Sequence, residues 1–270
     1  MLSGLFSKAK NMINQLVPKI KALILDMDGV LWIANQPIGN LSKIFDRIAD
    51  LDLKVVFATN NSTQDTNQTL EKLAGFGIKA EPWQITNSAS SVSHLMKKQF
   101  PNGGPVYIIG EIGLENTLNK AGFYHSENPI AVVAGFDRNF TFEKLSKATA
   151  FIRRGCPLYF TNPDTTFPTK DGLTPGAGSI LAAIETASES KAIVAGKPFQ
   201  AMFELALSRT GTNPEETLVV GDRLNTDIQG GQNAHCKTAL VLSGVTTYEM
   251  ATKWTPKIDL IAQNLTELIG

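Results

Sequence analysis

The stretch LILDMDGVLW (residues 23–32) ends a short aliphatic run with two aspartates that are separated by one residue. Side chains alternate faces along a strand, so Asp26 and Asp28 point the same way if the strand continues, while Met27 points away. Two neighbouring carboxylates repel each other unless a cation or a shared proton offsets the repulsion. Proteins commonly hold Mg²⁺ by one or two carboxylates and a substrate phosphate, so the pair indicates a metal and a phosphoryl group. On its own, however, Asp-Gly is also a common turn signal.

Three further aliphatic runs are followed by polar or charged side chains: KVVFAT (54–59), AIVAG (192–196) and TLVVG (217–221). The residues that close or follow these runs are Thr59, Asn60, Asn61, Lys197 and Asp222. Ligands of open α/β sheets bind beyond the carboxyl ends of the strands. We therefore expect the four runs to belong to one sheet and to bring acids, a hydroxyl with amides and an ammonium group to one edge.

These runs are apolar at successive positions, which is typical of strands buried on both faces of a parallel sheet. ALIL (22–25) and TALVLSG (238–244) belong to the same class, and helix-like segments lie between many of the runs, at 41–51, 64–75 and 198–210. This alternation of strands and helices predicts an α/β fold with a doubly wound parallel sheet.

The middle of the chain interrupts this alternation with strand-like runs of its own at 106–110 and 130–135 and a helix at 142–153. Roughly a hundred residues are enough for a second α/β unit inserted into the first. We predict a core in two parts, residues 1–85 and 191–270, with an inserted α/β cap domain over residues 86–190. Within the cap, the segment 161–179 is rich in Pro, Gly, Asn and Asp, which predicts loop and turn.

The composition argues against several classes of partner. Twenty-five basic and 25 acidic residues among 270 give a formal net charge of zero, so we expect neither nucleic acid nor an anionic membrane as a ligand. No apolar run reaches the length of about 18 residues that spans a bilayer. We predict a short amphipathic helix over residues 2–17 in place of a secretory or organelle leader, and a cytoplasmic location. Cys156 and Cys236 form no CxxC pair and are expected to be buried free thiols.

The segments DMDGVLW, FATNNST, AGKP and GDRLNTDI resemble, in this order, the four motifs of the haloacid dehalogenase (HAD) superfamily of aspartyl-phosphate phosphatases. More narrowly, TNPDTTFPT and DGLTPGAGSILAAIETAS followed by AGKP resemble the NagD-like, para-nitrophenyl-phosphatase subgroup (subfamily IIA), and the similarity extends from about Lys21 to Leu268. Only 30 residues separate Asp28 from Thr59, whereas 135 lie between Asn61 and Lys197. A cap therefore fits only after the second motif, as in that subgroup, on a Rossmann-like HAD core.

The resemblance implies a Mg²⁺-dependent phosphatase of small phosphomonoesters. Asp26 would be the nucleophile that forms an aspartyl-phosphate. Asp28 would protonate the leaving alcohol and then take a proton from the water that hydrolyses the intermediate. The Mg²⁺ ligands would be the side chains of Asp26 and Asp222 and the backbone carbonyl of Asp28.

The same resemblance implies phosphate-binding roles on the other motifs. The Thr59 hydroxyl and the neighbouring Asn60 amide would hold phosphate oxygens, and Lys197 would neutralise the transferring group. This division suits phosphoryl transfer, in which positioning and charge stabilisation supply most of the catalysis.

Several residues keep two interpretations. Asp227 either supports the site, by holding a metal-bound water or orienting Lys197, or lies at a helix N-terminus. Asn61 either contacts the substrate or caps the following helix. Asn162 and Asp164 in the cap either reach the leaving group or stabilise their own turn through Asx hydrogen bonds.

Ala34 and His235 stand where many relatives have glycine, so His235 is expected in a left-handed backbone conformation. Phe167 stands where pyridoxal-phosphatase-like relatives carry histidine, which argues against pyridoxal phosphate as the preferred substrate. His94 and His125 have no metal-ligand spacing around them.

Phosphoglycolate, glycerol phosphate, nucleotides and sugar phosphates all remain candidate substrates. A phosphotransferase or phosphomutase would use the same motifs but needs a second phosphate site in the cap, where the loop offers only Lys170 and Arg138, Arg153 and Arg154 lie elsewhere. A signalling receiver domain is about half as long and has no cap, and a non-catalytic phospho-ligand-binding protein would be expected to lose Asp26 or Asp28. The resemblance leaves open a homodimer or tetramer formed through the cap.

Overall fold

The computed structural model describes residues 12–169 and 172–270, and the chain forms two compact units. We call residues up to 58, 70–85 and 206–270 the core unit, and residues 59–69 and 86–205 the insert unit. The insert unit thus also includes 59–69 and 191–205, which the sequence-based boundaries assign to the core. The location of the cap boundaries at 86 and 190 stays a prediction.

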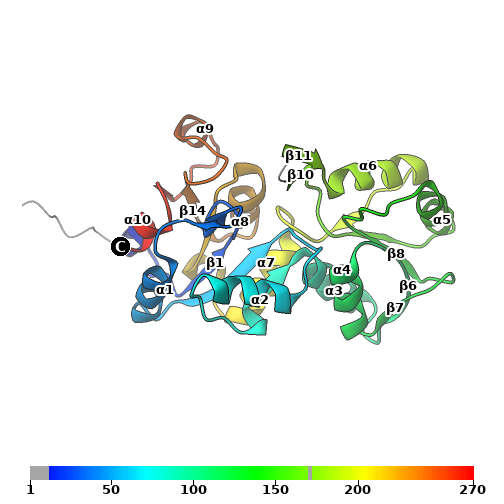
Figure 1. Cartoon of the computed structure of the whole chain (residues 1–270), viewed down its shortest axis with the longest axis horizontal. Coiled ribbons are helices and arrows are strands. Elements are labelled where there is room, and N and C mark those ends of the chain that lie inside the picture. Colours follow the sequence, from blue (N-terminus) through cyan, green and yellow to red (C-terminus); the bar gives the residue numbers. More distant parts are fainter. Residues whose placement is uncertain (1–11, 170–171) are drawn as a thin grey trace, which may run out of the picture. The chain divides into compact units, whose positions relative to one another are not determined.

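The core unit, which contains β1 and β14 in Figure 1, is built on a parallel sheet. The strand order of this sheet is β15-β14-β13-β1-β4-β5. Its strands are β1 (Ala22–Leu25), β4 (Lys54–Thr59), β5 (Ile85–Asn87), β13 (Thr217–Gly221), β14 (Lys237–Val241) and β15 (Leu260–Ala262). The predicted strands at 22–25, 54–59 and 217–221 are confirmed, and the doubly wound α/β class with them. All four residues of β1 are buried, because helices cover both faces of a parallel sheet.

Helices and short turns join these strands, and two of them extend over residues of both units. They are η1 (Met12–Gln15), α1 (Leu41–Asp50), α2 (Thr66–Gly75), η2 (Pro82–Gln84), α7 (Gln200–Thr210), η3 (Pro214–Glu216), η4 (Leu224–Ile228), α8 (Gln229–Asn233), α9 (Tyr248–Thr252) and α10 (Leu265–Ile269), with a small hairpin of β2 (Trp32–Ile33) and β3 (Gln36–Pro37). Leu41, Ile44 and Ile48 place the apolar face of α1 on the cluster that contains Leu23 and Leu25 of β1.

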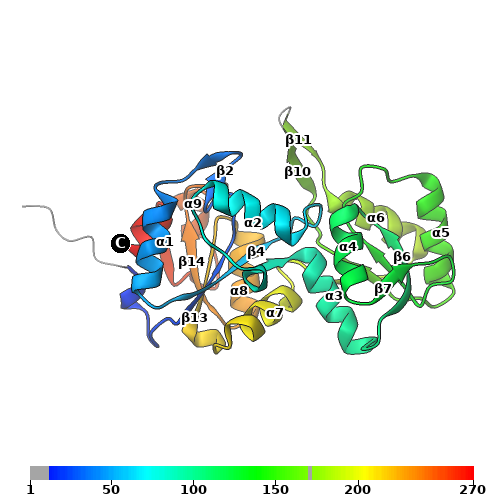
Figure 2. The same ribbon diagram turned by 60° about the horizontal axis from the view of Figure 1, so that its bottom comes forward.

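The insert unit has a parallel sheet of its own, with strand order β12-β9-β8-β6-β7. Its elements are α3 (Ser88–Gln99), β6 (Gly104–Ile109), α4 (Ile112–Lys120), β7 (Phe123–His125), β8 (Ala131–Ala134), α5 (Phe142–Arg153), β9 (Leu158–Phe160), α6 (Ala177–Ser188) and β12 (Ile193–Val194). Helices α3 and α4 pack on one face of the sheet, and α5 and α6 on the other (Figure 2). The predicted helix at 142–153 is confirmed with both bounds.

Two predictions about the elements are wrong: the sheet that one strand joins, and the loop at 161–179. The run AIVAG forms β12, which pairs with β9 in the insert sheet and not with the core strands. A short aliphatic run indicates a strand but does not say which sheet it joins, and Ile193 of β12 is in fact exposed. The segment 161–179, predicted as loop, contains an antiparallel hairpin of β10 (Thr166–Thr169) and β11 (Gly172–Pro175). Both strands of a two-stranded ladder are edge strands, where Pro and Gly are tolerated.

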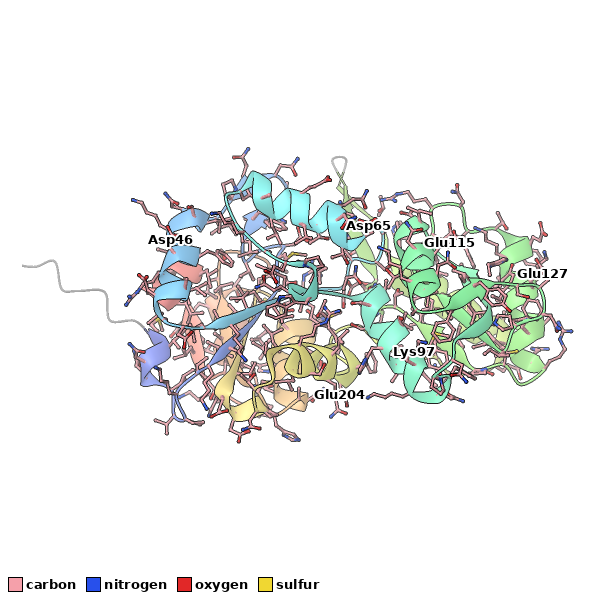
Figure 3. The ribbon with its side chains drawn as sticks, turned by 90° about the horizontal axis from the view of Figure 1, so that it is seen from below. Asp46, Asp65, Lys97, Glu115, Glu127 and Glu204 are labelled. Atoms are coloured by element: carbon pink, nitrogen blue, oxygen red, sulfur yellow. The ribbon has the colours of Figure 1, made fainter. Side chains whose placement is uncertain are left out.

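Charged side chains are concentrated on the surface, as Asp46, Glu115 and Glu127 show by projecting away from the ribbon in Figure 3. The described residues bury only four charged side chains, which are Asp137, Lys197, Asp222 and Asp227. Asp137 has an ion-pair partner in Lys144. Burying charge is costly, and buried ionisable groups concentrate at functional sites, so Lys197, Asp222 and Asp227 are candidates for a functional site.

The remaining predictions about single residues can be checked one by one. His235 has φ +59°, in the left-handed region as expected, and Ala34 has φ +53°. Cys236 is a buried free thiol, and burial raises its pKa to about 12, whereas Cys156 is half-buried. Most of the predicted helix at 2–17 lies outside the described residues, and residues 12–15 form a 3₁₀ turn.

Among the described residues, no helix combines the length and the apolar character needed to span a bilayer.

Candidate active site

Three carboxylates of the core unit lie together. One oxygen from each of Asp26, Asp222 and Asp227 can be chosen so that all three lie within 4.8 Å of one another. The strands explain the meeting of the first two, because Leu25 at the end of β1 pairs with Val220 of β13, and the Asp26 N–H donates to the Val220 carbonyl at 2.9 Å. Each acid then follows its own strand at the same edge of the sheet.

The Asp222 carboxylate is 2% exposed and is held by backbone. Its Oδ2 accepts a hydrogen bond from the Val245 N–H at 2.8 Å. A Cβ atom at Gly29 would lie 2.5 Å from the same oxygen, and one at Gly244 would overlap it. Only glycines leave room for this carboxylate, and Gly29 has in addition a φ of +82°.

A serine joins the loop after β14 to the first motif. The Ser243 hydroxyl donates to the Gly29 carbonyl at 2.7 Å. Sequence analysis missed Ser243, Gly244 and Val245, although the pair Ser-Gly directly after an aliphatic run was a usable signal.

Asp227 lies in η4, a π-helical turn of five residues that follows β13. Such turns occur frequently at functional sites. The Oδ2 of Asp227 accepts from the Arg223 N–H at 3.1 Å, and a Cβ at Gly221 would overlap the Asp227 side chain. Asp227 thus makes a local bond at the start of the turn and also belongs to the group of three acids.

Asp28 has a different environment. Its side chain is exposed, whereas Met27 is 5% exposed, and Asp28 does not belong to the group of Asp26, Asp222 and Asp227. The Trp32 indole N–H donates to Asp28 Oδ1 at 2.9 Å. Sequence analysis also missed Trp32 as a partner of this carboxylate.

A second group of predicted residues lies in the insert unit, around Asn60. Asn60 Oδ1 accepts from the Lys197 N–H at 2.8 Å, and Asn60 Nδ2 donates to the Lys197 carbonyl at 3.0 Å and to Asp164 Oδ1 at 3.1 Å. The side-chain amide of Asn60 is therefore engaged with Lys197 and Asp164. The predicted phosphate contact of Asn60 is therefore left to its backbone amide as a proposal.

Two further side chains form hydrogen bonds with the backbone of Asn60. The Ser88 hydroxyl and Asn162 Nδ2 both donate to the Asn60 carbonyl, at 2.6 and 2.7 Å. Asn162 Oδ1 also accepts from the Asp164 N–H at 3.2 Å, which is the local turn bond expected for an Asx residue. Asn162 and Asp164 are thus tied to Asn60 and to their own turn.

Thr59 closes β4 and is 6% exposed. Its Oγ1 accepts from the Asn61 N–H at 3.1 Å, and Asn61 Oδ1 accepts from the N–H and the hydroxyl of Thr63 at 2.9 and 2.8 Å. Asn61 does not cap α2, because Asp65 Oδ1 accepts from the Gln68 N–H there. The structure thus places Thr59, Asn60 and Lys197 in the insert unit and the acids in the core unit.

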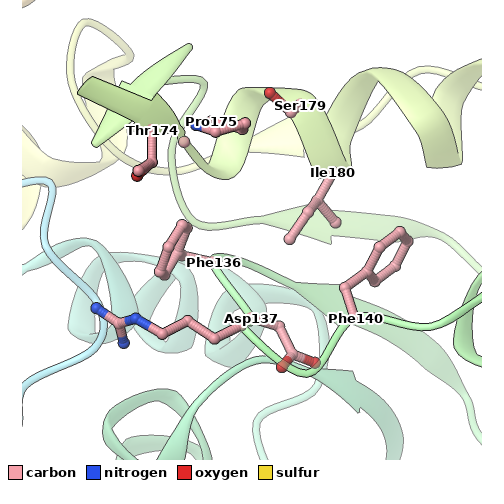
Figure 4. Close-up of a pocket in the computed structure, with 9 residues that line it drawn as sticks. Phe136, Asp137, Phe140, Thr174, Pro175, Ser179 and Ile180 are labelled. Carbon is pink, nitrogen blue, oxygen red and sulfur yellow. The ribbon is translucent and has the colours of Figure 1, made fainter. Parts of the chain in front are cut away.

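A cavity of about 360 Å³ lies within the insert unit (Figure 4). Phe136, Phe140 and Ile180 give it apolar walls, and Arg138 is its cation. The Arg138 Nη1 donates to both carboxylate oxygens of Glu111, at 2.6 and 2.7 Å, so its charge is already compensated. This cavity suits an uncharged group better than a second phosphate.

Comparisons with known proteins agree with the motifs. A family model of haloacid dehalogenase-like hydrolases matches residues 23–124, and a HAD-hydrolase-like model matches residues 194–268. The chain is 34% identical over 251 residues to the 5′-nucleotidase YutF of Bacillus subtilis, covering 92% of this chain and 97% of that protein.

Solved structures show the same similarity over most of the chain. NagD of E. coli K-12 matches with a TM-score of 0.86 at 32% identity, over 92% of this chain and 98% of its own. A glycerol phosphate phosphatase of Mycobacterium tuberculosis, solved in complex with magnesium, matches with a TM-score of 0.84 at 32% identity, over 92% and 76% of the two chains.

Proposed function

The chain belongs to the haloacid dehalogenase-like hydrolases, in the NagD-like subgroup, and we propose that it is a Mg²⁺-dependent phosphatase that hydrolyses small phosphomonoesters. The observation that carries this proposal is the group Asp26, Asp222 and Asp227, whose oxygens approach within 4.8 Å of one another. Two of these carboxylates are almost fully buried, at 2% and 1% exposure. Like charges at this distance call for a cation.

The donor set fits Mg²⁺. The three carboxylates offer hard oxygen ligands, which Mg²⁺ prefers, and few neutral donors compete with them. Asp26, Asp222, the backbone carbonyl of Asp28 and Asp227, directly or through water, would hold the ion. When bound, the ion supplies positive charge to the oxygens of the transferring phosphoryl group.

Asp26 and Asp28 then carry the covalent chemistry. An oxygen of Asp26 attacks phosphorus, which forms the aspartyl-phosphate bond as the ester P–O bond breaks. Asp28 gives its proton to the departing oxygen. In the second half, water attacks phosphorus, Asp28 takes the proton of that water, and phosphate leaves with the Asp26 carboxylate restored.

Thr59, the backbone amide of Asn60 and the Lys197 ammonium group bind and neutralise phosphate oxygens in this proposal. Lys197 is 4% exposed, and both of its backbone polar groups are held by the Asn60 side chain. These bonds fix the backbone from which the Lys197 side chain starts, which supports charge stabilisation by a preorganised group.

The names of the relatives suggest the substrate class: a nucleotide for one, glycerol phosphate for another. The test is a phosphate-release screen over phosphoglycolate, glycerol 3-phosphate, nucleoside monophosphates and sugar phosphates, each with Mg²⁺ and with EDTA. We expect turnover of at least one ester, abolished by EDTA. Turnover that EDTA leaves unchanged contradicts the metal dependence, and no turnover of any ester contradicts the function.

A phosphotransferase or phosphomutase gains little support from the insert unit. Arg138 is paired with Glu111, and Arg153 with Glu189. Arg154 donates to the Ala150 carbonyl and lies over the Phe151 ring.

The predicted association through the cap into a dimer or tetramer is a separate proposal, which light scattering of the purified chain tests.

A further inference from the structure

The Trp32 side chain is 1% exposed, yet it carries an N–H group. A buried indole N–H normally has an acceptor, because leaving it without one is costly. The acceptor is Asp28 Oδ1 at 2.9 Å, although the Asp28 side chain itself is exposed. A rigid, buried donor therefore holds one oxygen of an exposed carboxylate.

The orientation of the indole is fixed by contacts other than Asp28. The Trp32 ring stacks on Phe76 with centroids 5.3 Å apart and an interplanar angle of 23°. The Lys72 Nζ lies over the same ring, 4.2 Å from its centroid, which is cation–π distance. Both partners come from α2 or the residue after it, so packing against this segment sets the direction of the N–H.

The backbone between the two residues is equally constrained. The Gly29 N–H donates to the Trp32 carbonyl at 2.7 Å, and the Trp32 N–H lies 3.3 Å from the Met27 carbonyl. The tight loop from 27 to 32 thus returns Trp32 to Asp28, and the two residues also form a β-bridge.

We propose that Trp32 is a positioning residue that anchors Oδ1 of Asp28 and so presents Oδ2 to the leaving group. This role rests on the proposed function, in which Asp28 is the proton donor. The proton moves from Oδ2 to the ester oxygen as the P–O bond breaks and its electron pair passes to that oxygen. Trp32 touches neither the substrate nor the transferred proton.

The proposal predicts an effect that depends on the leaving group. An alkoxide leaves poorly without a proton, whereas p-nitrophenolate is a stable anion that leaves without one. The quantity to compare is kcat/KM, because it reports only the steps up to departure of the leaving group. The later hydrolysis of the aspartyl-phosphate is common to all substrates.

The decisive variant is Trp32→Phe, which keeps an aromatic ring for Phe76 and Lys72 and removes the N–H. We expect its kcat/KM for glycerol 3-phosphate to fall about 10-fold, and that for p-nitrophenyl phosphate to change less than about 2-fold. An equal loss on both substrates would show a merely structural role and overturn the proposal, as would no loss on either.

Trp83 provides a matched control, since its indole N–H also donates to a carboxylate, Glu81 Oε2, at 2.7 Å. Trp83→Phe should leave both values of kcat/KM unchanged. Should Trp32→Phe fail to fold, Phe76→Leu keeps the N–H and removes only the ring behind it. In Phe76→Leu, kcat/KM should again fall more for glycerol 3-phosphate than for p-nitrophenyl phosphate, but by a smaller factor. An equal effect on both substrates overturns the proposal.

A spectroscopic measurement separates this proposal from the proposed function. The chain has three tryptophans, and the indole N–H resonance of Trp32 is the one lost in Trp32→Phe. We expect Asp28→Ala to shift this resonance and to leave those of Trp83 and Trp254 in place. If it does not move, the Trp32–Asp28 contact is absent in solution and the proposal falls regardless of activity. If it moves but the wild type hydrolyses none of the phosphate esters in the screen, the proposed function fails, and the role of Trp32 in proton transfer with it.

Discussion

The carboxylates of the core unit and the lysine of the insert unit are held in place by different means. In the core unit, backbone holds the acids: the register of β1 and β13, the Val245 N–H, and glycines that leave room for Asp222. In the insert unit, a side chain holds the lysine, because the Asn60 amide binds both backbone polar groups of Lys197. The acids depend on backbone contacts and on space beside the backbone, and the lysine depends on one side-chain amide 137 positions away.

The two arrangements should therefore respond differently to substitution. Acids held by backbone are sensitive to any atom added beside them, whereas a lysine held by an amide is sensitive to loss of that amide. Each of the following substitutions tests one side of this difference.

The largest effect is expected for Asp26→Asn. Loss of the nucleophile should lower kcat by at least about 10⁴-fold with Mg²⁺ present. The fold should be retained, because the strand pairing that positions residue 26 uses its backbone N–H. Phosphate release and circular dichroism provide the measurement, and turnover within about 10-fold of the wild type contradicts the nucleophile assignment.

Gly244→Ala tests whether the core carboxylates depend on space beside the backbone. A Cβ there overlaps Asp222 Oδ2 and should displace this carboxylate, which we expect to weaken Mg²⁺ binding by about 10–100-fold. Isothermal titration with Mg²⁺ measures this loss. Gly75→Ala is the control, since nothing lies within 4 Å of the added atom. Equal Mg²⁺ affinities in the two variants would contradict the claim that glycines leave the space in which Asp222 lies.

The side-chain support of the lysine calls for a double-mutant cycle. We expect Lys197→Ala to lower kcat by about 10²–10³-fold and Asn60→Ala by about 10-fold. If Asn60 acts through Lys197, the double variant should be no slower than Lys197→Ala, because coupled residues are not additive. Effects that multiply would mean that the Asn60 side chain contributes independently, for example by binding phosphate itself.

The smallest effect is expected for a residue that contacts Asn60 but not Lys197. Ser88→Ala removes one of two donors to the Asn60 carbonyl and should cost about 0.5–1.5 kcal/mol of unfolding free energy. Its kcat should fall about 2- to 3-fold through the displaced Asn60. Ser91 is the control, because it lies on the same helix as Ser88 and its hydroxyl donates to a different carbonyl, that of Asn87. Urea unfolding should show similar losses for Ser88→Ala and Ser91→Ala. A fall in kcat for Ser91→Ala as large as that for Ser88→Ala would contradict the link to Asn60.

The core group could be predicted from sequence because its determinants are local. Asp26 and Asp222 each follow a buried aliphatic run. A strand that is apolar on both faces can be recognised in a single sequence. Residues that follow neighbouring parallel strands lie near each other whatever their separation in sequence. The left-handed backbone of His235 was likewise predictable, because relatives have glycine at that position.

The insert group could not be predicted in the same way. Lys197 follows an aliphatic run as Asp222 does, but that run joins a different sheet, and strand partners are not encoded in hydrophobicity. The side-chain amide of Asn60 can form hydrogen bonds equally well with phosphate, within its own turn or with a distant backbone. Only the three-dimensional structure identifies Lys197 as its partner. The bond from Trp32 to Asp28 was hidden for another reason: a tryptophan in an apolar stretch is most simply explained as core.

The most direct test is to trap the phosphoryl group on Asp26. In Asp28→Asn no side chain activates the attacking water, while p-nitrophenyl phosphate still reacts because its leaving group needs no proton. With Mg²⁺, this variant should release about one nitrophenolate per enzyme in a burst, and peptide mass spectrometry after acid quenching should find one phosphoryl group on the peptide that contains Asp26. A phosphoryl group on any other residue, or nitrophenolate release with Asp26 unmodified, would contradict the mechanism.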